Sequence, residues 1–155
     1  MGESAPVACT PAGIVALLNF HGIELPGRHV VVVGRGLTIG RPLANLLSLK
    51  CPTTNAAVTV VHTGVADIGA LTRHADVVVA AAGAPGLVTA DMVKPGAAVV
   101  GAGVTFVDGK VVSDVADDVA DVAGWITPRL GGVGPMTRAM LFANAVAAAE
   151  RSLAP

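Results

Sequence analysis

The sequence is poor in aromatic and charged residues, and it contains no tyrosine. Aromatic residues make up 3% of the 155 positions, charged residues make up 14%, and the formal net charge is −1. So weak a charge gives no electrostatic attraction to nucleic acid or to an anionic membrane surface, and we expect neither as a partner. The two cysteines, Cys9 and Cys51, lack the spacing of a metal site and predict free thiols in a reducing compartment, the cytoplasm.

The sequence also lacks the segments that send a chain into or across a membrane. No N-terminal stretch has the basic, apolar and small-residue order of a signal peptide. The apolar run at residues 139–149 is interrupted by Asn144 and is too short to span a bilayer. The 53% of hydrophobic residues therefore predicts a buried core. We expect one domain over residues 9–155, preceded by a loose leader at residues 1–8.

The stretch from His29 to Pro42 predicts a strand, a glycine turn and the start of a helix. Four consecutive valines at residues 30–33 suit a strand that is buried on both faces of a parallel sheet. Three glycines and a proline expected at the first helical position then bring a helix N-terminus to the end of that strand, where a pyrophosphate commonly binds. The glycine spacing is one residue longer than the usual dinucleotide pattern, so a plain strand–turn–helix connection remains the alternative.

Strand and helix patterns alternate along the rest of the chain. We predict strands at residues 29–33, 57–62, 76–83, 97–103 and 124–127, and a hairpin of residues 104–107 and 110–112 around Asp108-Gly109. Helices are predicted at residues 11–21, 41–49, 67–74, 89–93, 115–122 and 136–153, the first and fourth capped by Thr10 and Thr89. The predicted fold is α/β: a Rossmann-like, doubly wound, mostly parallel sheet with helices on both faces.

The end of the second predicted strand bears on which nucleotide binds. An NAD site usually has an acidic residue there for the ribose 2′-hydroxyl, whereas this sequence reads His62-Thr63-Gly64. Arg35 and Arg41 lie in and after the glycine turn, and cations beside a hydroxyl suit a 2′-phosphate. These residues favour NADP over NAD. The alternatives are that Arg35 is an ordinary exposed charge and that His62 caps the strand locally.

Several motifs occur in the order found in a known enzyme family. The sequence resembles the C-terminal NAD(P)-binding domain of the bifunctional methylenetetrahydrofolate dehydrogenase/methenyltetrahydrofolate cyclohydrolase. The resemblance rests on residues 9–13, 34–42, 75–77, 94–97 and above all on Gly-Gly-Val-Gly-Pro-Met-Thr at residues 131–137.

The resemblance implies a set of cofactor-binding residues. Gly34 and Arg35 would contact the cofactor phosphates, Thr63 would lie near the 2′-phosphate, and Val104 would lie against the cofactor. Residues 131–135 would line the folate side of the cleft. The full implied set is Gly34, Arg35, Gly36, Gly40, Arg41, Thr63, Gly83, Val104, Gly131, Gly132, Gly134 and Pro135.

The resemblance also implies a reaction that these residues do not complete. The family transfers a hydride from 5,10-methylenetetrahydrofolate to NADP and then hydrolyses the product to 10-formyltetrahydrofolate, using a tyrosine and a lysine from an N-terminal domain. This sequence has no tyrosine, and we expect no catalytic residue in it. Folate would bind only together with a complementary catalytic domain. The alternative is a standalone, non-catalytic dinucleotide-binding or structural domain. The family also implies a homodimer, with the Asp108-Gly109 hairpin as the candidate contact; the alternative is that this is an ordinary surface hairpin.

Four residues depart from the family pattern. Gly36 stands where serine is usual, Gly101 where aspartate is usual, Ser113 where glycine is usual and Leu130 where proline is usual. Loss of the serine hydroxyl is expected to weaken cofactor binding. The changes at Gly101 and Leu130 concern the folate side.

Overall fold

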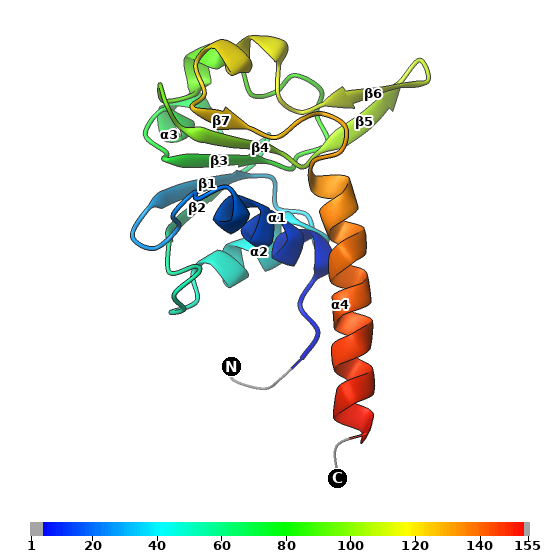
Figure 1. Cartoon of the computed structure of the whole chain (residues 1–155). Helices are drawn as coiled ribbons and strands as arrows, with labels where there is room; N and C mark the ends of the chain where they lie inside the picture. The colour runs from blue at the N-terminus through cyan, green and yellow to red at the C-terminus, as the bar shows by residue number, and fades with distance from the viewer. Residues whose placement is uncertain (1–4, 154–155) are drawn as a thin grey trace.

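The computed structural model describes residues 5–153 and contains one five-stranded sheet in which all strands are parallel (Figure 1). Residues 5–8 of the predicted leader form no regular secondary structure, and the other leader residues lie outside the described part. The sheet has the order β2-β1-β3-β4-β7 and comprises β1 (His29–Val33), β2 (Ala57–Val61), β3 (Val77–Ala80), β4 (Ala98–Gly101) and β7 (Trp125–Ile126). The predicted strands are all present, and most are a few residues shorter than predicted.

Helices cover both faces of the sheet, as predicted. The helices α1 (Cys9–Phe20) and α2 (Gly40–Leu47) lie on one face, and α3 (Gly69–Thr72) with the 3₁₀-helices η1 (Ala90–Met92) and η2 (Asp117–Asp121) lies on the other (Figure 1). Alternate strand residues point to opposite faces, so Val30 and Val32 join the first core while Val31 and Val33 join the second. Each fully buried valine contributes about 1.5–3 kcal/mol, which explains the continuous valine run.

The strand order reverses between β1 and β3. From β1 the chain moves outward to β2, then returns to the other side of β1 and proceeds through β3 and β4 to β7. The connections on the two sides of the reversal leave in opposite directions, so a crevice forms outside the carboxyl ends of β1 and β3. The glycine turn follows β1 and therefore lies at this crevice, which agrees with the predicted place of a dinucleotide.

Several predicted helix bounds and caps are wrong for local reasons. Helix α2 begins at Gly40 and ends at Leu47, so Pro42 is its third residue and not its first. Helix α3 has only four residues and starts two residues after Asp67, whose side chain accepts a hydrogen bond from the N–H group of Ala70 instead of joining the helix. Thr89 makes no side-chain cap to η1, and its hydroxyl bonds the carboxylate of Asp91 instead.

The helix predicted at residues 115–122 is the shorter 3₁₀-helix η2. Its first residues are held in an extended bridge, since Val115 pairs with Val88 and the N–H group of Ala116 bonds the carbonyl of Val88. A helix can begin only after this bridge, which places its start at Asp117.

Helices α1 and α4 (Val133–Leu153) also differ from prediction at their first turns. Helix α1 begins at Cys9 without a side-chain cap, and Thr10 instead forms a 3.0 Å hydroxyl–hydroxyl hydrogen bond with Thr137 of α4. Helix α4 begins three residues before the predicted Met136. Because Gly13 would place a Cβ only 3.0 Å from the Cβ of Met136, the two helices cross closely at this point.

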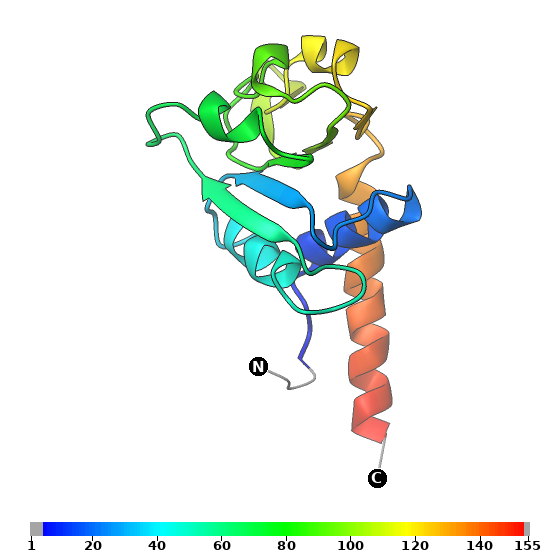
Figure 2. The ribbon, with the colours of Figure 1, turned by 90° about the vertical axis from the view of Figure 1, so that its left-hand side faces the viewer.

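Beyond its crossing with α1, helix α4 projects away from the body of the domain (Figures 1 and 2). Its projecting part carries several exposed apolar side chains. Their exposed fractions are 59% for Leu141, 72% for Phe142, 57% for Val146 and 83% for Leu153. No helix within residues 5–153 combines the length and apolar character needed to cross a membrane.

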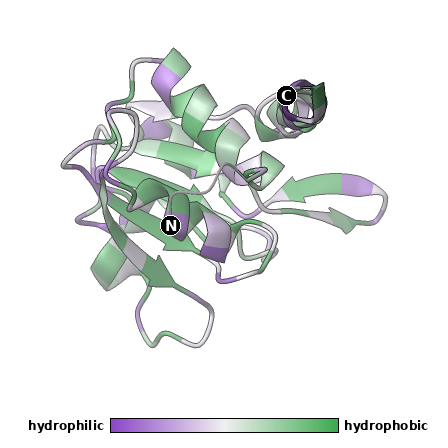
Figure 3. Ribbon diagram, turned by 90° about the horizontal axis from the view of Figure 1, so that it is seen from below, coloured by the Kyte–Doolittle hydropathy of each residue, from purple (hydrophilic) through white to green (hydrophobic). Residues whose placement is uncertain are grey.

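The predicted hairpin is present and stands apart from the main sheet. Strands β5 (Val104–Val107) and β6 (Lys110–Ser113) pair antiparallel, and Asp108 and Gly109 have φ values of 49° and 75° in the turn between them. Figure 3 shows that its strands are mostly hydrophobic although they project from the domain. Phe106 near the tip is 74% exposed.

Candidate functional site

The glycine turn after β1 is held together by two close approaches of backbone to backbone. A Cβ on Gly34, whose φ is +132°, would lie 2.1 Å from the carbonyl oxygen of Ala81. A Cβ on Gly40 would lie 2.2 Å from the carbonyl oxygen of Gly34. Both distances are far below van der Waals contact, so these two positions admit only glycine. Gly36, in contrast, faces open space, with no atom within 4 Å of an added Cβ.

The same turn forms one wall of a hollow at the strand-order reversal. The N–H group of Arg41 bonds the carbonyl of Gly36 at 3.1 Å and closes the turn against the start of α2. Gly36, Thr38, Ile39 and Gly40 line this side of a hollow of about 350 Å³. The N–H groups of Arg41 and Leu43 are already bonded and Pro42 has none, so this wall suits an anion mainly through the positive potential of the helix N-terminus.

The opposite wall follows β3 and β4. It consists of residues 81–83 after β3 and residues 102–104 after β4. Gly83 has a φ of +67°, and Val104, which lines the hollow, is half exposed. Sequence reasoning did not assign a role to Asp114, which holds this wall from behind: its Oδ2 accepts 2.7 Å hydrogen bonds from the N–H groups of Ala82 and Gly83.

A second hollow of about 560 Å³ continues the first toward α4. Ile39, Ala102 and Val104 line both hollows, so the two form one groove along the carboxyl ends of the strands. Gly131, Gly132, Gly134 and Pro135 line its far end, together with Arg129 and Arg138. A Cβ on Gly132 would lie 2.7 Å from the carbonyl oxygen of Pro128, so this glycine is required by packing. We name the two hollows together the carboxyl-edge groove.

Positive charge lies at one rim of the carboxyl-edge groove. Arg35 and Arg41 are exposed, and neither side chain forms an ion pair within residues 5–153. The register pairs Val33 with Val61, so Arg35 and Thr63 each follow their strand end by two residues on neighbouring strands. His62 uses its ring Nδ1 to accept a 3.1 Å hydrogen bond from the N–H group of Gly64, which is the local capping role left open from the sequence.

The structure therefore brings most of the predicted residues together, in different roles. Eight of them line the carboxyl-edge groove: Gly36, Gly40, Gly83, Val104, Gly131, Gly132, Gly134 and Pro135. Gly34 packs beneath the turn, and Arg35, Arg41 and Thr63 line neither hollow and stand at the open side. The open space at Gly36, the positive N-terminal end of α2 and two cations without an ion pair fit a diphosphate with a further phosphate.

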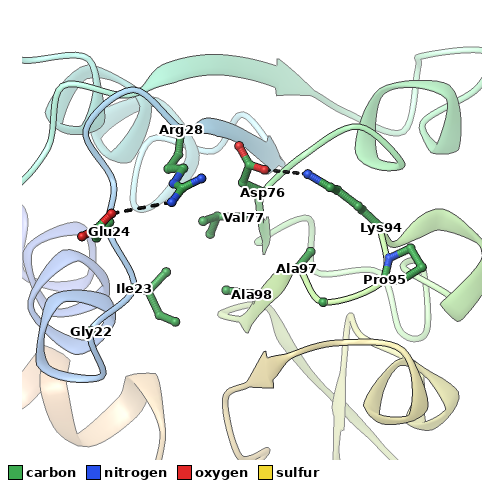
Figure 4. Close-up of a pocket in the computed structure, with 11 residues that line it drawn as sticks. Gly22, Ile23, Glu24, Arg28, Asp76, Val77, Lys94, Pro95, Ala97 and Ala98 are labelled. Atoms are coloured by element: carbon green, nitrogen blue, oxygen red, sulfur yellow. Dashed lines mark hydrogen bonds and ion pairs between the residues drawn. The ribbon is translucent and has the colours of Figure 1, made fainter.

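A separate hollow of about 360 Å³ lies at the amino ends of the strands (Figure 4). Two ion pairs border it, one between Arg28 and Glu24 at 3.6 Å and one between Lys94 and Asp76 at 2.8 Å. The hydrogen bond from Lys94, and after it the one from the N–H group of His29, lowers the pKa of Asp76 below its usual value. The charged side chains that border this hollow are paired with each other. Ligands of open α/β sheets bind at the opposite edge of the sheet, so this hollow is not the nucleotide site.

Comparison with known proteins agrees with this geometry. Residues 8–153 match the family model described as "Tetrahydrofolate dehydrogenase/cyclohydrolase, NAD(P)-binding domain". The chain is 59% identical over 148 residues to "Bifunctional protein FolD" of Syntrophotalea carbinolica, and the match covers 96% of this chain and 51% of that protein.

Two solved structures are also similar. The bifunctional FolD methylenetetrahydrofolate dehydrogenase/cyclohydrolase of Campylobacter jejuni superposes with a TM-score of 0.90 at 40% identity, over 97% of this chain and 53% of that one. The Trypanosoma brucei FolD enzyme, complexed with NADP cofactor and inhibitor, has a TM-score of 0.85 at 43% identity, over 95% and 52%. The chain thus spans about half the length of the relatives that it matches.

Proposed function

The chain belongs to the family of tetrahydrofolate dehydrogenase/cyclohydrolase NAD(P)-binding domains, and from this membership we propose that it binds NADP in the carboxyl-edge groove. The diphosphate would lie against the turn of residues 34–40 and the positive N-terminal end of α2. The observation that carries this proposal is the pair of contacts at Gly34 and Gly40, which leave Gly36 facing open space at the strand-order reversal.

The charges at the rim support NADP in preference to NAD. Arg35 and Arg41 have no acidic partner within the described residues, and Thr63 adds a hydroxyl beside the end of β2. An acidic residue that would bind a free 2′-hydroxyl is not present at residues 62–64. A guanidinium group pairs well with a phosphate through charge-assisted hydrogen bonds.

We infer that the groove serves an enzyme of folate one-carbon metabolism. NADP, when bound, supplies a hydride acceptor for 5,10-methylenetetrahydrofolate, and this chain's part is to hold and orient that acceptor. The 155 residues contain no tyrosine, and none of the groove residues is a lysine, so the acid–base chemistry of the second step needs a complementary folate-binding domain. The exposed apolar side chains of projecting α4 support the docking of such a domain.

The hairpin supports a homodimer. Val104, Phe106 and Val107 of β5 are between 43% and 74% exposed on a ribbon that projects from the domain. An apolar ribbon with free strand edges is suited to pairing with a second copy. Cys9 and Cys51 are free thiols, which supports the proposed cytoplasmic location.

A binding and turnover experiment tests the proposed function. The purified chain is titrated with NADP by calorimetry, and it is then mixed with NADP and 5,10-methylenetetrahydrofolate while the near-ultraviolet absorbance of reduced cofactor is followed. We expect saturable NADP binding without turnover.

A fusion in which the chain follows the other half of the Syntrophotalea carbinolica protein is expected to gain turnover. The matched fusion with Arg35→Ala is expected to need more NADP for half-maximal rate. Absence of NADP binding, or turnover by the chain alone, contradicts the proposed function.

A further inference from the structure

We propose that Asp114 is a positioning residue that fixes residues 82–83 and makes this wall of the groove favour oxidised over reduced cofactor. The oxidised nicotinamide ring carries a positive charge and the reduced ring is neutral, so a buried carboxylate behind the wall distinguishes them. The inference rests on the proposed function, because it concerns how the same groove treats the two forms of its cofactor.

Asp114 is tied to the wall by short hydrogen bonds from two consecutive backbone groups. Its Oδ2 accepts the N–H groups of Ala82 and Gly83, both at 2.7 Å, which is the length of charge-assisted bonds. The carbonyl of Gly83 is held as well, since the hydroxyl of Thr105 donates to it at 3.1 Å. Asp114 and Thr105 both come from the hairpin segment, so hydrogen bonds hold the hairpin and the loop after β3 together.

The backbone around Asp114 is shaped to bury its carboxylate completely. Asp114 has no exposed surface, and a Cβ on Gly103 would lie only 1.8 Å from its Oδ2, so glycine at this position makes room for it. Its other oxygen, Oδ1, has no hydrogen-bond partner within residues 5–153. A buried carboxylate with one unpaired oxygen is costly, which points to a role other than stabilising the fold.

The hydrogen bonds to Asp114 make the two walls of the groove differ in the N–H groups that they offer to a ligand. The N–H groups of Ala82 and Gly83 are occupied by Asp114, so they are not available to a phosphate. The phosphates are left to the start of α2 on the other side of the strand-order reversal. Because the 2′-phosphate end of the cofactor belongs with β2, the nicotinamide end extends over β3 and β4, next to the wall that Asp114 holds.

The charge of Asp114 acts on the nicotinamide ring without direct contact because the carboxylate is shielded from solvent. Salt and water screen buried charges much less than exposed ones. For an illustrative separation of about 10 Å and an effective dielectric constant of about 20–40, one unit charge favours the charged ring about fourfold to sixteenfold. No charged side chain lines the first hollow, and Arg129 and Arg138, which line the second, are unchanged in the variants compared below.

The test compares affinities for NADP⁺ and NADPH in the unaltered chain and in Asp114→Asn. The amide oxygen of asparagine still accepts both N–H groups, so the loop keeps its place while the charge is lost. We expect the unaltered chain to bind NADP⁺ more tightly, and Asp114→Asn to lower the ratio of the two affinities about fourfold or more. Asp118→Asn, which removes an exposed carboxylate from η2, is the matched control and should leave the ratio unchanged.

A second control separates the effect of the Asp114 charge from that of holding the Gly83 backbone in place. Thr105→Val removes the other hydrogen bond to Gly83 and should weaken both cofactor forms equally. Equal affinity of the unaltered chain for NADP⁺ and NADPH overturns the inference without any variant, and so does an unchanged ratio in folded Asp114→Asn. Absence of binding by either form overturns the inference and the proposed function together.

Discussion

Gly40 at the start of α2 packs directly on Gly34 at the end of β1. A Cβ on Gly40 would lie 2.2 Å from the carbonyl oxygen of Gly34, and Gly34 in turn contacts the backbone of Ala81. Three backbone segments thus meet without side chains between them, and the meeting point lies at the strand-order reversal. The contact fixes where α2 begins and leaves Gly36 open toward the groove.

We predict that Gly40→Ala destabilises the chain. The added methyl group has no room, so the helix must shift from the strand, and overpacking of this kind costs about 1–3 kcal/mol. Thermal or urea unfolding measures the loss. Gly36→Ala is the matched control, because its methyl group meets no atom within 4 Å. Equal stability of the two variants would show that the Gly34–Gly40 contact does not constrain the fold.

Gly36→Ser should strengthen NADP binding. The position faces open space in the first hollow, so a hydroxyl fits there and can donate to a phosphate oxygen. One net hydrogen bond contributes about 1 kcal/mol, or about fivefold in the dissociation constant. Calorimetric titration measures the change, and Gly36→Ala serves as the variant without the hydroxyl. Equal or weaker binding by the serine variant would place the phosphates elsewhere.

Cys51 should react faster with thiol reagents at neutral pH than an ordinary exposed cysteine. The hydrogen bond from the side chain of Thr53, and then that from its backbone, lowers the pKa of the Cys51 thiol below 9.0. The rate of reaction with a disulfide reagent, measured against pH, gives the midpoint. Thr53→Val is expected to raise that midpoint, and Cys51→Ser identifies any reaction at Cys9. A midpoint unaffected by Thr53→Val contradicts this explanation.

The ion pair between Lys94 and Asp76 should make stability depend on pH in the acid range. The pKa of Asp76 is lowered by Lys94 and by the N–H group of His29, so the pair stabilises the fold above the unfolded-state value of 3.8. This stabilisation is lost as the pH falls through the lower folded-state pKa. At neutral pH, Asp76→Asn should cost about 0.5–1 kcal/mol by urea unfolding, a cost that disappears in strong acid.

Glu24→Gln is the control for that measurement. Glu24 also pairs with a cation, Arg28, but the distance is 3.6 Å and its side chain is 79% exposed. Solvent screens such a pair, so its loss should change stability little at any pH. A cost of Asp76→Asn that persists unchanged in acid would mean that the carboxylate charge is not its cause.

The sequence predicted the parallel sheet well because its central strands β1 and β3 are runs of buried valine. Residues 29–33 were predicted as a strand and form β1, and the Asp108-Gly109 turn forms the hairpin as expected. Helix starts were less predictable. Pro42 was expected at a first helical position, yet it is the third residue of α2. Pro135, which precedes the helix predicted at residues 136–153, is likewise the third residue of α4, since the first turn of a helix needs no partner for these nitrogens.

The site was predictable where neighbours along the chain determine it, and not where distant contacts do. The turn of residues 34–40 is a local pattern, and it lies at the groove as expected. Asp114 gave no such signal, because the groups that it holds are 31 and 32 positions away in the sequence. The short helix η2 was mispredicted for the same reason, since the bridge between Val88 and Val115 is also a distant contact.

The most direct test is a side-by-side titration of the purified chain and of Arg35→Ala with NADP and with NAD. We predict that the unaltered chain binds NADP more tightly than NAD, and that Arg35→Ala loses about tenfold of its NADP affinity, as expected for a charge-assisted contact, while its NAD affinity changes little. Tighter binding of NAD by the unaltered chain, or no binding of either nucleotide, would contradict the assignment of the carboxyl-edge groove as an NADP site.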